Sequence, residues 1–201
     1  EVKTPLALLT LVLDNRRDTL PEAVGFKLDY ARNRMQAFID QMLYYARLRG
    51  ARRDYRFERL TLRSCIDEVL DDYRPLLEEK HIRIERQLAD ETVFTDRRGL
   101  CFLLGQLVSN SVKYTSDAPV LTFSLTCNTA ETVLTVRDNG PGVRACDLPY
   151  VFEKGFTGDS GHEKSKATGM GLYLAREIAK ELGLTLSAAS DWGAGFAVCI
   201  S

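Results

Sequence analysis

The chain has 201 residues, enough for one or two domains with a substantial core, and its 27 Lys and Arg nearly balance 28 Asp and Glu. The formal net charge of -1 argues against a nucleic acid or an anionic membrane surface as the partner. The five cysteines show no C-x-x-C spacing, which argues against a zinc site or a disulfide framework and fits a reducing cytoplasm.

Residues 1–54 have the pattern of two amphipathic helices that form a hairpin. Apolar residues recur at alternating steps of four and three, which is a heptad seam. They are Val24, Leu28, Ala31, Met35, Phe38, Met42 and Tyr45 in the second segment, and Val2, Leu6, Leu9 and Leu13 in the first. Because one hairpin leaves a strict seam exposed, the pattern predicts a homodimer whose hairpins pair into a four-helix bundle. The alternative left open is that the hairpin packs only on the second domain.

Residues 55–201 follow a linker of basic and small residues, and their pattern predicts a second domain. Alternating apolar patterns predict strands over residues 55–60, 82–88, 92–95, 120–126, 132–137, 184–190 and 196–201. Helices are predicted after Thr61 and Asp96, each an N-cap residue, and from Gly171 to Leu182. The predicted inner face of the helix after Thr61 consists of Ile66, Val69, Leu70, Tyr73, Leu76 and Leu77. That of the helix after Asp96 consists of Leu100, Leu103, Leu104, Leu107 and Val108. This mixture favours an α/β sandwich with helices on one face of a mixed sheet.

Three polar residues stand on one face near the end of the predicted helix after Asp96. Asn110, Lys113 and Tyr114 occupy positions i, i+3 and i+4, opposite the leucines. An amide oxygen can ligate Mg2+, a lysine can pair with phosphate, and a tyrosine ring can lie beside a base. Taken alone, the three residues fit an ordinary solvated face at least as well.

Asp138 follows an apolar strand and precedes the turn Gly140-Pro141-Gly142. A carboxylate there can accept a hydrogen bond from the exocyclic amine of adenine, while the glycines let the backbone pass close to the ring. On their own, the same residues also make a plain turn at the end of a strand.

A second glycine pair, Gly169-Met170-Gly171, opens the last predicted helix, whose N–H groups could face phosphate, and Thr168 adds a hydroxyl. Residues 154–167 are rich in Gly, Ser and Lys, the composition of a mobile lid. No G-x-x-x-x-G-K-[ST] motif is present in the sequence. The three motifs together predict an ATP pocket that is not a P-loop.

The chain resembles the cytoplasmic core of a bacterial sensor histidine kinase of a two-component system over nearly all of its length. The similar motifs are Asn110 to Tyr114 for the asparagine box, Asp138-x-Gly140-x-Gly142 for the first glycine box, Phe152 to Phe156 for the phenylalanine box and Gly169-x-Gly171-Leu172 for the second glycine box. Residues 1–5 resemble those that follow the phospho-accepting histidine. Gln106 stands where many members have a second asparagine. The amino-acid sequences of residues 105–111 and 152–158 are most similar to those of the subgroup that senses cell-envelope stress or peptide antibiotics.

The resemblance implies an α+β chain in two parts. Residues 1–54 would be a dimerisation and histidine-phosphotransfer hairpin, and residues 55–201 a catalytic ATP-binding domain of the fold shared with gyrase, Hsp90 and MutL. The activity implied is transfer of the γ-phosphoryl group of ATP to a histidine just upstream of Glu1 and onward to a response regulator receiver domain. The alternative is an ATP-binding regulatory module without kinase activity.

The resemblance also implies roles for single residues. Asn110 would bind Mg2+, Glu1 would act as general base beside the histidine, and Thr4 would position water for dephosphorylating the regulator. The ATP-binding set is Asn110, Lys113, Tyr114, Asp138, Gly140, Gly142, Phe152, Lys154, Thr168, Gly169, Gly171 and Leu172. No apolar run approaches the roughly 20 residues that span a bilayer. We therefore expect a cytoplasmic portion of an inner-membrane protein, with its anchor and sensor outside this chain.

Overall fold

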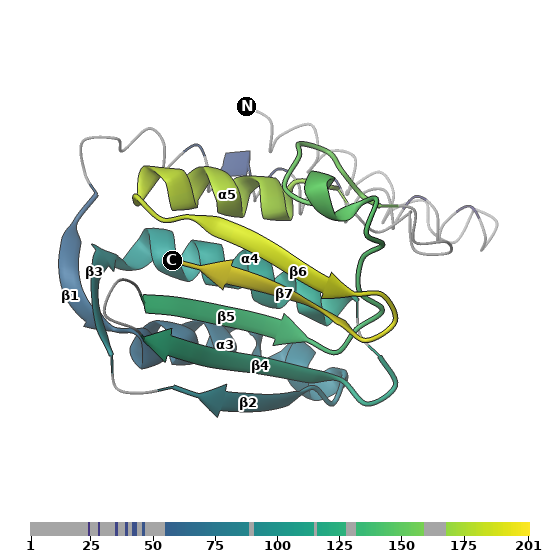
Figure 1. The fold of residues 1–201 in the computed structure, drawn as a ribbon, viewed down its shortest axis with the longest axis horizontal. Coiled ribbons are helices and arrows are strands. Elements are labelled where there is room, and N and C mark those ends of the chain that lie inside the picture. Colours follow the sequence, from purple (N-terminus) through teal and green to yellow (C-terminus); the bar gives the residue numbers. More distant parts are fainter. Residues whose placement is uncertain are drawn as a thin grey trace. The chain divides into compact units, whose positions relative to one another are not determined.

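The computed structural model divides the chain into two compact units, Glu1–Asp54 and Tyr55–Ser201. It describes residues 55–88, 91–114, 116–127, 132–158 and 168–201, together with seven separate positions between residues 24 and 46 (Figure 1). Those seven positions are helical. The rest of the predicted hairpin, with Glu1 and Thr4, lies outside the described residues, so the four-helix bundle and the homodimer stay predictions.

The described part of the second unit contains an α+β arrangement of helices and strands. In chain order they are β1 (Phe57–Thr61), α3 (Leu62–Glu79), β2 (Arg83–Gln87), β3 (Thr92–Asp96), α4 (Arg97–Lys113), β4 (Val120–Cys127), β5 (Thr132–Asp138), the 3-10 helix η2 (Leu148–Tyr150), α5 (Gly171–Glu181), β6 (Leu186–Asp191) and β7 (Gly195–Ile200). Each strand and helix predicted for residues 55–201 is present, with ends that differ by at most two residues.

Five strands form a mixed sheet in the order β2-β4-β5-β7-β6, and β1 pairs with β3 in a separate two-stranded sheet. Strand β2 runs parallel to β4, whereas the other neighbours in the large sheet are antiparallel. Helix α4 contacts both α3 and α5, and the three helices lie on one side of the sheet (Figure 1). The predicted mixed sheet with helices on one face is confirmed.

The face of the large sheet turned toward the helices is apolar except at one end. The register places Leu121, Asp138 and Phe196 in one row across β4, β5 and β7, and all three are buried. The neighbouring row on the opposite face contains Thr122 and Arg137, which are at least partly exposed. Asp138 is therefore a carboxylate on the core side of the sheet.

Helix α4 begins and packs as predicted. Asp96 accepts a hydrogen bond of 2.8 Å at Oδ1 from the backbone N–H of Gly99, and one of 2.9 Å at Oδ2 from the backbone N–H of Arg56. The five predicted inner-face residues are all buried: Leu100, Leu103, Leu104, Leu107 and Val108. Because a buried apolar side chain of this size contributes about 1.5–3 kcal/mol, this stripe anchors α4 firmly against the sheet.

Helix α3 differs from its prediction at one residue. Four predicted inner-face residues are buried, Ile66, Val69, Leu70 and Leu77, whereas Leu76 is 44% exposed. Leu76 is turned by about 100° from Leu77 around a helix of 3.6 residues per turn, and it falls outside the buried stripe. Thr61 is the N-cap residue, but its side chain makes no capping hydrogen bond; Ser64 Oγ instead donates to the Thr61 carbonyl at 2.8 Å. The helix continues through Pro75.

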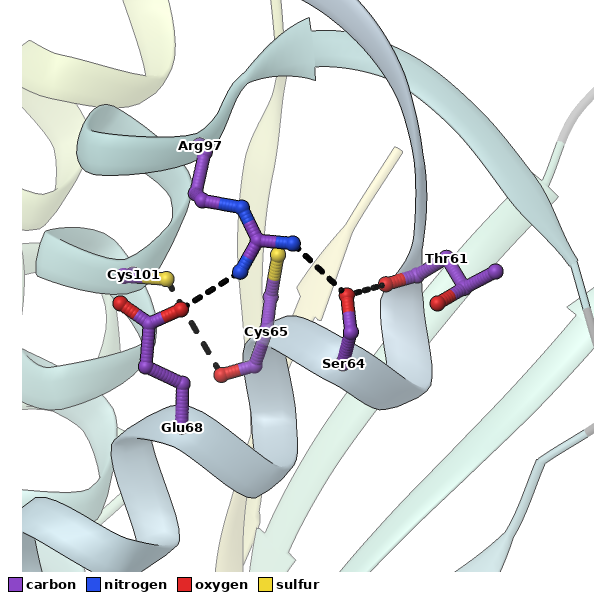
Figure 2. A network of polar contacts seen from close by, with 6 residues as sticks. All are labelled: Thr61, Ser64, Cys65, Glu68, Arg97 and Cys101. Carbon is purple, nitrogen blue, oxygen red and sulfur yellow. Dashed lines mark hydrogen bonds and ion pairs between the residues drawn. The ribbon is translucent and has the colours of Figure 1, made fainter.

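A polar network joins the start of α3 to the start of α4 (Figure 2). Arg97 donates to the Glu68 carboxylate at 2.6 Å and to Ser64 Oγ at 3.2 Å. Beside it, Cys101 Sγ lies 4.0 Å from the carbonyl oxygen of Cys65. A hydrogen bond from Cys101, aided by the charge of Arg97, lowers the pKa of the Cys65 thiol to about 7, although burial acts in the opposite direction. The network fixes the two helices against each other near their N-termini.

Candidate functional site

Asp138 is the last residue of β5 and is only 8% exposed. Ser111 on α4 donates a hydrogen bond of 3.0 Å to its Oδ2, and the backbone N–H of Gly140 donates one of 3.0 Å to its Oδ1. A carboxylate oxygen can accept more than one hydrogen bond. Asp138 is therefore held in place by the protein and still has acceptor capacity for a ligand.

The environment of Asp138 changes its acidity. Burial raises the pKa of its carboxyl above the ordinary value, because the low-dielectric interior disfavours the charged form. The hydrogen bonds from Gly140 and Ser111 act in the opposite direction but do not cancel the effect of burial. A raised carboxyl pKa beside an open pocket is a feature that marks functional sites.

The turn after Asp138 passes so close to neighbouring backbone that two of its positions have no room for a Cβ atom. A Cβ atom on Gly140 would lie 2.2 Å from the carbonyl oxygen of Tyr114. A Cβ atom on Gly142, whose φ is +69°, would lie 2.5 Å from the carbonyl oxygen of Asp191. Both glycines are therefore required by contacts within the protein, and the predicted approach of their backbone to a base stays a prediction.

Asn139, between Asp138 and Gly140, binds the protein through both polar atoms of its side chain. Its Oδ1 accepts hydrogen bonds from the backbone N–H of Val120 at 2.7 Å and from Ser116 Oγ at 3.2 Å. Its Nδ2 donates to the carbonyl oxygen of Ala118 at 2.8 Å. Asn139 thus fixes the segment that leads into β4 and does not face the pocket described next.

A pocket opens beside Asp138, between the end of α4, the segment after β5 and the β6–β7 turn. Its empty space, including the part open to solvent, is about 700 Å3. The residues predicted for the ATP site that line it are Asn110, Tyr114, Asp138, Gly142 and Leu172. The fold thus brings parts of the asparagine box and of both glycine boxes to one cavity.

The other predicted residues of the ATP-binding set do not line this pocket. The Nζ of Lys113, a half-buried residue, lies 5.2 Å from the centroid of the Tyr114 ring. Phe152 is half-buried and packs against the core, and Lys154 is exposed. Gly140 is buried beneath the turn that it begins. The roles of these residues toward ATP stay predictions.

Gly155 and Gly169 bring together the two ends of the predicted lid. The backbone N–H of Gly155 donates to the carbonyl oxygen of Gly169 at 3.0 Å, and a Cβ atom on Gly169 would lie 2.3 Å from the carbonyl carbon of Gly155. Thr168 Oγ1 accepts a hydrogen bond of 3.3 Å from the backbone N–H of Met170, just before α5 begins at Gly171. The middle of the predicted lid lies outside the described residues.

Arg144, Asp147 and Trp192 are among the pocket residues that were not predicted from the sequence. Arg144 Nε donates to Asp147 Oδ2 at 3.1 Å, and both residues line the pocket. Trp192, in the β6–β7 turn, also lines it and is 61% exposed. None of them belongs to a motif with known spacing. The one signal in the sequence is the presence of a large apolar residue in a turn otherwise made of small residues, at positions 191–195.

Comparison with known proteins identifies the fold. A family model described as histidine kinase-, DNA gyrase B-, and HSP90-like ATPase matches residues 95–201. The chain is similar to the sensor protein BceS of Halalkalibacterium halodurans, at 35% identity, and of Bacillus subtilis, at 33%, in each case over 97% of this chain and 57% of the relative. It therefore spans little more than half the length of these relatives. The solved structure of the Acinetobacter baumannii histidine kinase AdeS covers all of this chain and 96% of its own, with a TM-score of 0.69 and 22% identity.

A mixed sheet covered by helices on one face is the fold that the chain shares with this histidine kinase structure. The chain belongs to the family of histidine kinase-, DNA gyrase B- and HSP90-like ATPases. Its named relatives are sensor proteins and sensor histidine kinases, which confirms the resemblance found in the sequence. In the part of the chain that the structure describes, no helix has the length and apolar character to cross a membrane.

Proposed function

We propose that the chain is the core of a bacterial sensor histidine kinase that transfers the γ-phosphoryl group of ATP to a histidine just upstream of Glu1. The observation that carries this proposal is the position of Asp138, a nearly buried carboxylate held by Ser111 and Gly140 at a pocket that Asn110 also lines. Family membership and the names of the relatives support the same activity.

Asp138 would recognise the adenine base. Its carboxylate can accept a hydrogen bond from the exocyclic amine, and the structure keeps lone pairs available for this purpose. Guanine has a carbonyl oxygen at the corresponding ring position, which would face the carboxylate as a second acceptor. A site with a buried acceptor rejects a ligand that offers no donor to that acceptor. Leaving a buried polar group unpaired costs about 1–3 kcal/mol, and the cost is higher when the group is charged. The pocket should therefore prefer ATP to GTP.

The phosphate end of the ligand would lie toward Asn110 and the start of α5. The amide oxygen of Asn110 suits Mg2+, which keeps several waters and takes phosphate oxygens as further ligands. When bound, the ion offsets the negative charge of the phosphates. Lys113 and Lys154 would add positive charge, and Thr168 with the N–H groups at Gly169 and Gly171 would contribute hydrogen bonds. In-line phosphoryl transfer depends mainly on such positioning and charge neutralisation.

The first unit would supply the phosphotransfer half of the reaction. We propose that residues 1–54 form a hairpin that dimerises as a four-helix bundle, with Glu1 as general base for the upstream histidine. Thr4 would position water when the protein removes phosphate from its response regulator. The receiver domain of that regulator is the proposed partner, and the chain would be the cytoplasmic portion of an inner-membrane sensor of cell-envelope stress or peptide antibiotics.

The test is incorporation of labelled phosphate from Mg-ATP into the natural protein, carrying its own residues upstream of Glu1. We expect acid-labile, alkali-stable label on a histidine before Glu1, and transfer of that label to a receiver domain. ATP binding without label would favour the alternative, a regulatory module without kinase activity, and would contradict the proposal.

The matched controls exchange one carboxylate for an amide at two places. Asp138→Asn should abolish ATP binding and labelling. The amide would present to the adenine amine either its NH2 group, which is a donor, or its neutral oxygen, which is a weaker acceptor than the carboxylate. Asp71→Asn, on the solvent side of α3 where Asp71 pairs with Arg74, should change neither. Unchanged ATP affinity in Asp138→Asn would show that the pocket is assigned wrongly.

A further inference from the structure

Trp192 is the single tryptophan of the chain and lies at the pocket with most of its surface uncovered. Its exposed fraction is 61%, which is unusual because an indole ring offers a large apolar area whose burial is favourable. Isolated exposed apolar residues need no explanation, but this one borders the cavity whose other wall holds Asp138. A ligand in the pocket would therefore find an open aromatic face.

The turn that carries Trp192 is fixed to the backbone around Asp138. The backbone N–H of Gly193 donates to the carbonyl oxygen of Pro141 at 2.7 Å. A Cβ atom on Gly195 would lie 2.3 Å from the carbonyl oxygen of Asp138, so the turn contacts the same residue that supplies the pocket carboxylate. Trp192 therefore has a defined position relative to Asp138, although the two residues are far apart in the sequence.

Ser190 adds a second connection between the turn and the pocket. Its Oγ donates to the carbonyl oxygen of Gly195 at 2.9 Å and accepts a hydrogen bond of 2.7 Å from the backbone N–H of Val143. Val143 and Gly142 line the pocket, so the segment after β5 and the β6–β7 turn form one connected wall. The backbone that carries Trp192 is therefore already ordered before a ligand binds, which limits the conformational entropy lost on binding.

We propose that Trp192 is a binding residue for the base of the nucleotide, giving the adenine ring a stacking surface beside the hydrogen bond to Asp138. This inference rests on the proposed binding of ATP in this pocket. Stacking of a base on an aromatic ring is tolerant of base identity, since every base has a π-face. Trp192 therefore contributes affinity for the base, whereas Asp138 contributes the choice of adenine.

The test compares Trp192→Ala and Trp192→Phe with the unchanged chain, by calorimetric titration with Mg-ATP, Mg-GTP and inorganic tripolyphosphate with Mg2+. Trp192→Ala should weaken ATP binding by about tenfold, in line with base–aromatic stacking, and Trp192→Phe should weaken it by less than about threefold. The ratio of ATP to GTP affinity should stay constant in both variants. Tripolyphosphate has no base, so its affinity should not change.

Two controls separate this inference from the proposed function and from a general loss of structure. Phe94 on β3 is 68% exposed and does not line the pocket, so Phe94→Ala should leave ATP affinity unchanged. Asp138→Asn should lose ATP binding and, with it, the preference over GTP. If the unchanged chain binds no ATP, the proposed function fails. If it binds ATP and Trp192→Ala binds it equally well, the inference about Trp192 alone is wrong.

Because Trp192 is the single tryptophan, its emission reports on the contact directly. Saturating Mg-ATP should quench and shift the emission, whereas Mg-tripolyphosphate should leave it as it is. Emission that is insensitive to ATP at concentrations where calorimetry shows full binding would contradict the contact. An equal response to tripolyphosphate would also contradict it, since that ligand has no ring to stack.

Discussion

Ser111 Oγ donates a hydrogen bond of 3.0 Å to Oδ2 of Asp138, and both residues are buried, at 7% and 8% exposure. This contact connects α4, which carries Asn110 and is followed by Tyr114, to β5 at the floor of the pocket. The hydrogen bond also favours the charged form of Asp138 and lowers its pKa against the effect of burial. One serine therefore influences both the position and the protonation of the proposed adenine acceptor.

Replacing Ser111 with alanine should weaken this site. We expect the free energy of unfolding to fall by about 1–2 kcal/mol, because a buried charged group loses a hydrogen-bond partner. The pKa of Asp138 should rise further, and ATP affinity at neutral pH should fall. Denaturant unfolding and ATP titration measure the two effects. Ser109→Ala, at an exposed position of the same helix, should leave ATP affinity unchanged, and an equal loss there would contradict the assignment.

Replacing Asp138 with asparagine should abolish ATP binding without lowering stability. The pKa of Asp138 is higher in the folded protein than its ordinary value of 3.8, so its contribution to stability is present below that value and is lost as pH rises through the raised pKa. At neutral pH the buried charge therefore costs stability, and an amide removes that cost. Its oxygen can accept from the Gly140 N–H while its nitrogen donates to Ser111 Oγ. Thermal unfolding of the nucleotide-free protein at pH 7 should show an equal or higher midpoint, and a clear decrease would contradict this account.

ATP affinity should depend on pH through the same carboxyl group. A protonated carboxyl is a weaker acceptor for the adenine amine, and the raised pKa places its protonation at higher pH than for an exposed aspartate. Affinity should be constant well above the raised pKa and should fall as pH is lowered through it. The titration of the phosphates is removed by taking the ratio of the ATP and GTP affinities of the unchanged chain at each pH, because the two ligands carry the same triphosphate. A flat ratio would show that Asp138 does not contact the base.

Two glycines with similar backbone angles should differ in their tolerance of alanine. Gly142 has a φ of +69° and almost no space, with Asp191 O 2.5 Å from an added Cβ, whereas Gly183 has a φ of +73° and no atom within 4 Å of an added Cβ. Alanine in the left-handed region costs about 1–2 kcal/mol, so Gly183→Ala should lose about that much stability. Gly142→Ala should lose clearly more and should also weaken ATP binding. Urea unfolding of both variants measures the difference, and equal losses would mean that the crowding is relieved without cost.

Asn139 should prove structural although it lies inside the first glycine motif. Asn139→Ala removes three hydrogen bonds, to Val120, Ser116 and Ala118, and should lower the free energy of unfolding by about 1–3 kcal/mol. Asn139→Asp keeps the acceptor but lacks the donor to Ala118. Its free energy of unfolding should therefore lie between those of the unchanged chain and Asn139→Ala. ATP affinity, measured at a temperature where both variants are folded, should change by less than about threefold. A large loss of affinity with unchanged stability would assign Asn139 to the ligand instead.

The parts of the fold that the sequence predicted are those with local signals. Helix α4 has a capping residue, Asp96, followed by leucines at helical spacing, and both signals lie within the helix and its first turn. The prediction for Leu76 was wrong because the spacing of apolar residues does not distinguish a residue at the border of the buried face from a residue within that face. The parallel pairing of β2 with β4 was not predicted, since strands so far apart in the sequence pair through contacts of the whole domain.

The same distinction applies to the candidate site. Asn110, Tyr114 and Asp138 stand in motifs and were predicted, and they share a pocket. Trp192 was missed because its place is decided by the return of β6 and β7 to the turn after Asp138, a contact that no short pattern encodes. Arg144 was missed because it belongs to none of the motifs. The sequence also singled out Gly142, but not the backbone of Asp191 that makes glycine necessary there.

The contact between Gly155 and Gly169 has a consequence for how the chain can change over evolution. The two glycines close the stretch between them into a loop whose ends are held by the body of the domain. Doubling the number of residues between two fixed ends costs only about 0.6 kcal/mol of chain entropy, so insertions and deletions between Gly158 and Thr168 should be tolerated. Tolerance should end at Gly158, which lines the pocket, and at Thr168, which accepts a hydrogen bond from Met170. Loop length would then be free to vary with the partner or the rate of nucleotide exchange, while the floor of the pocket stays the same.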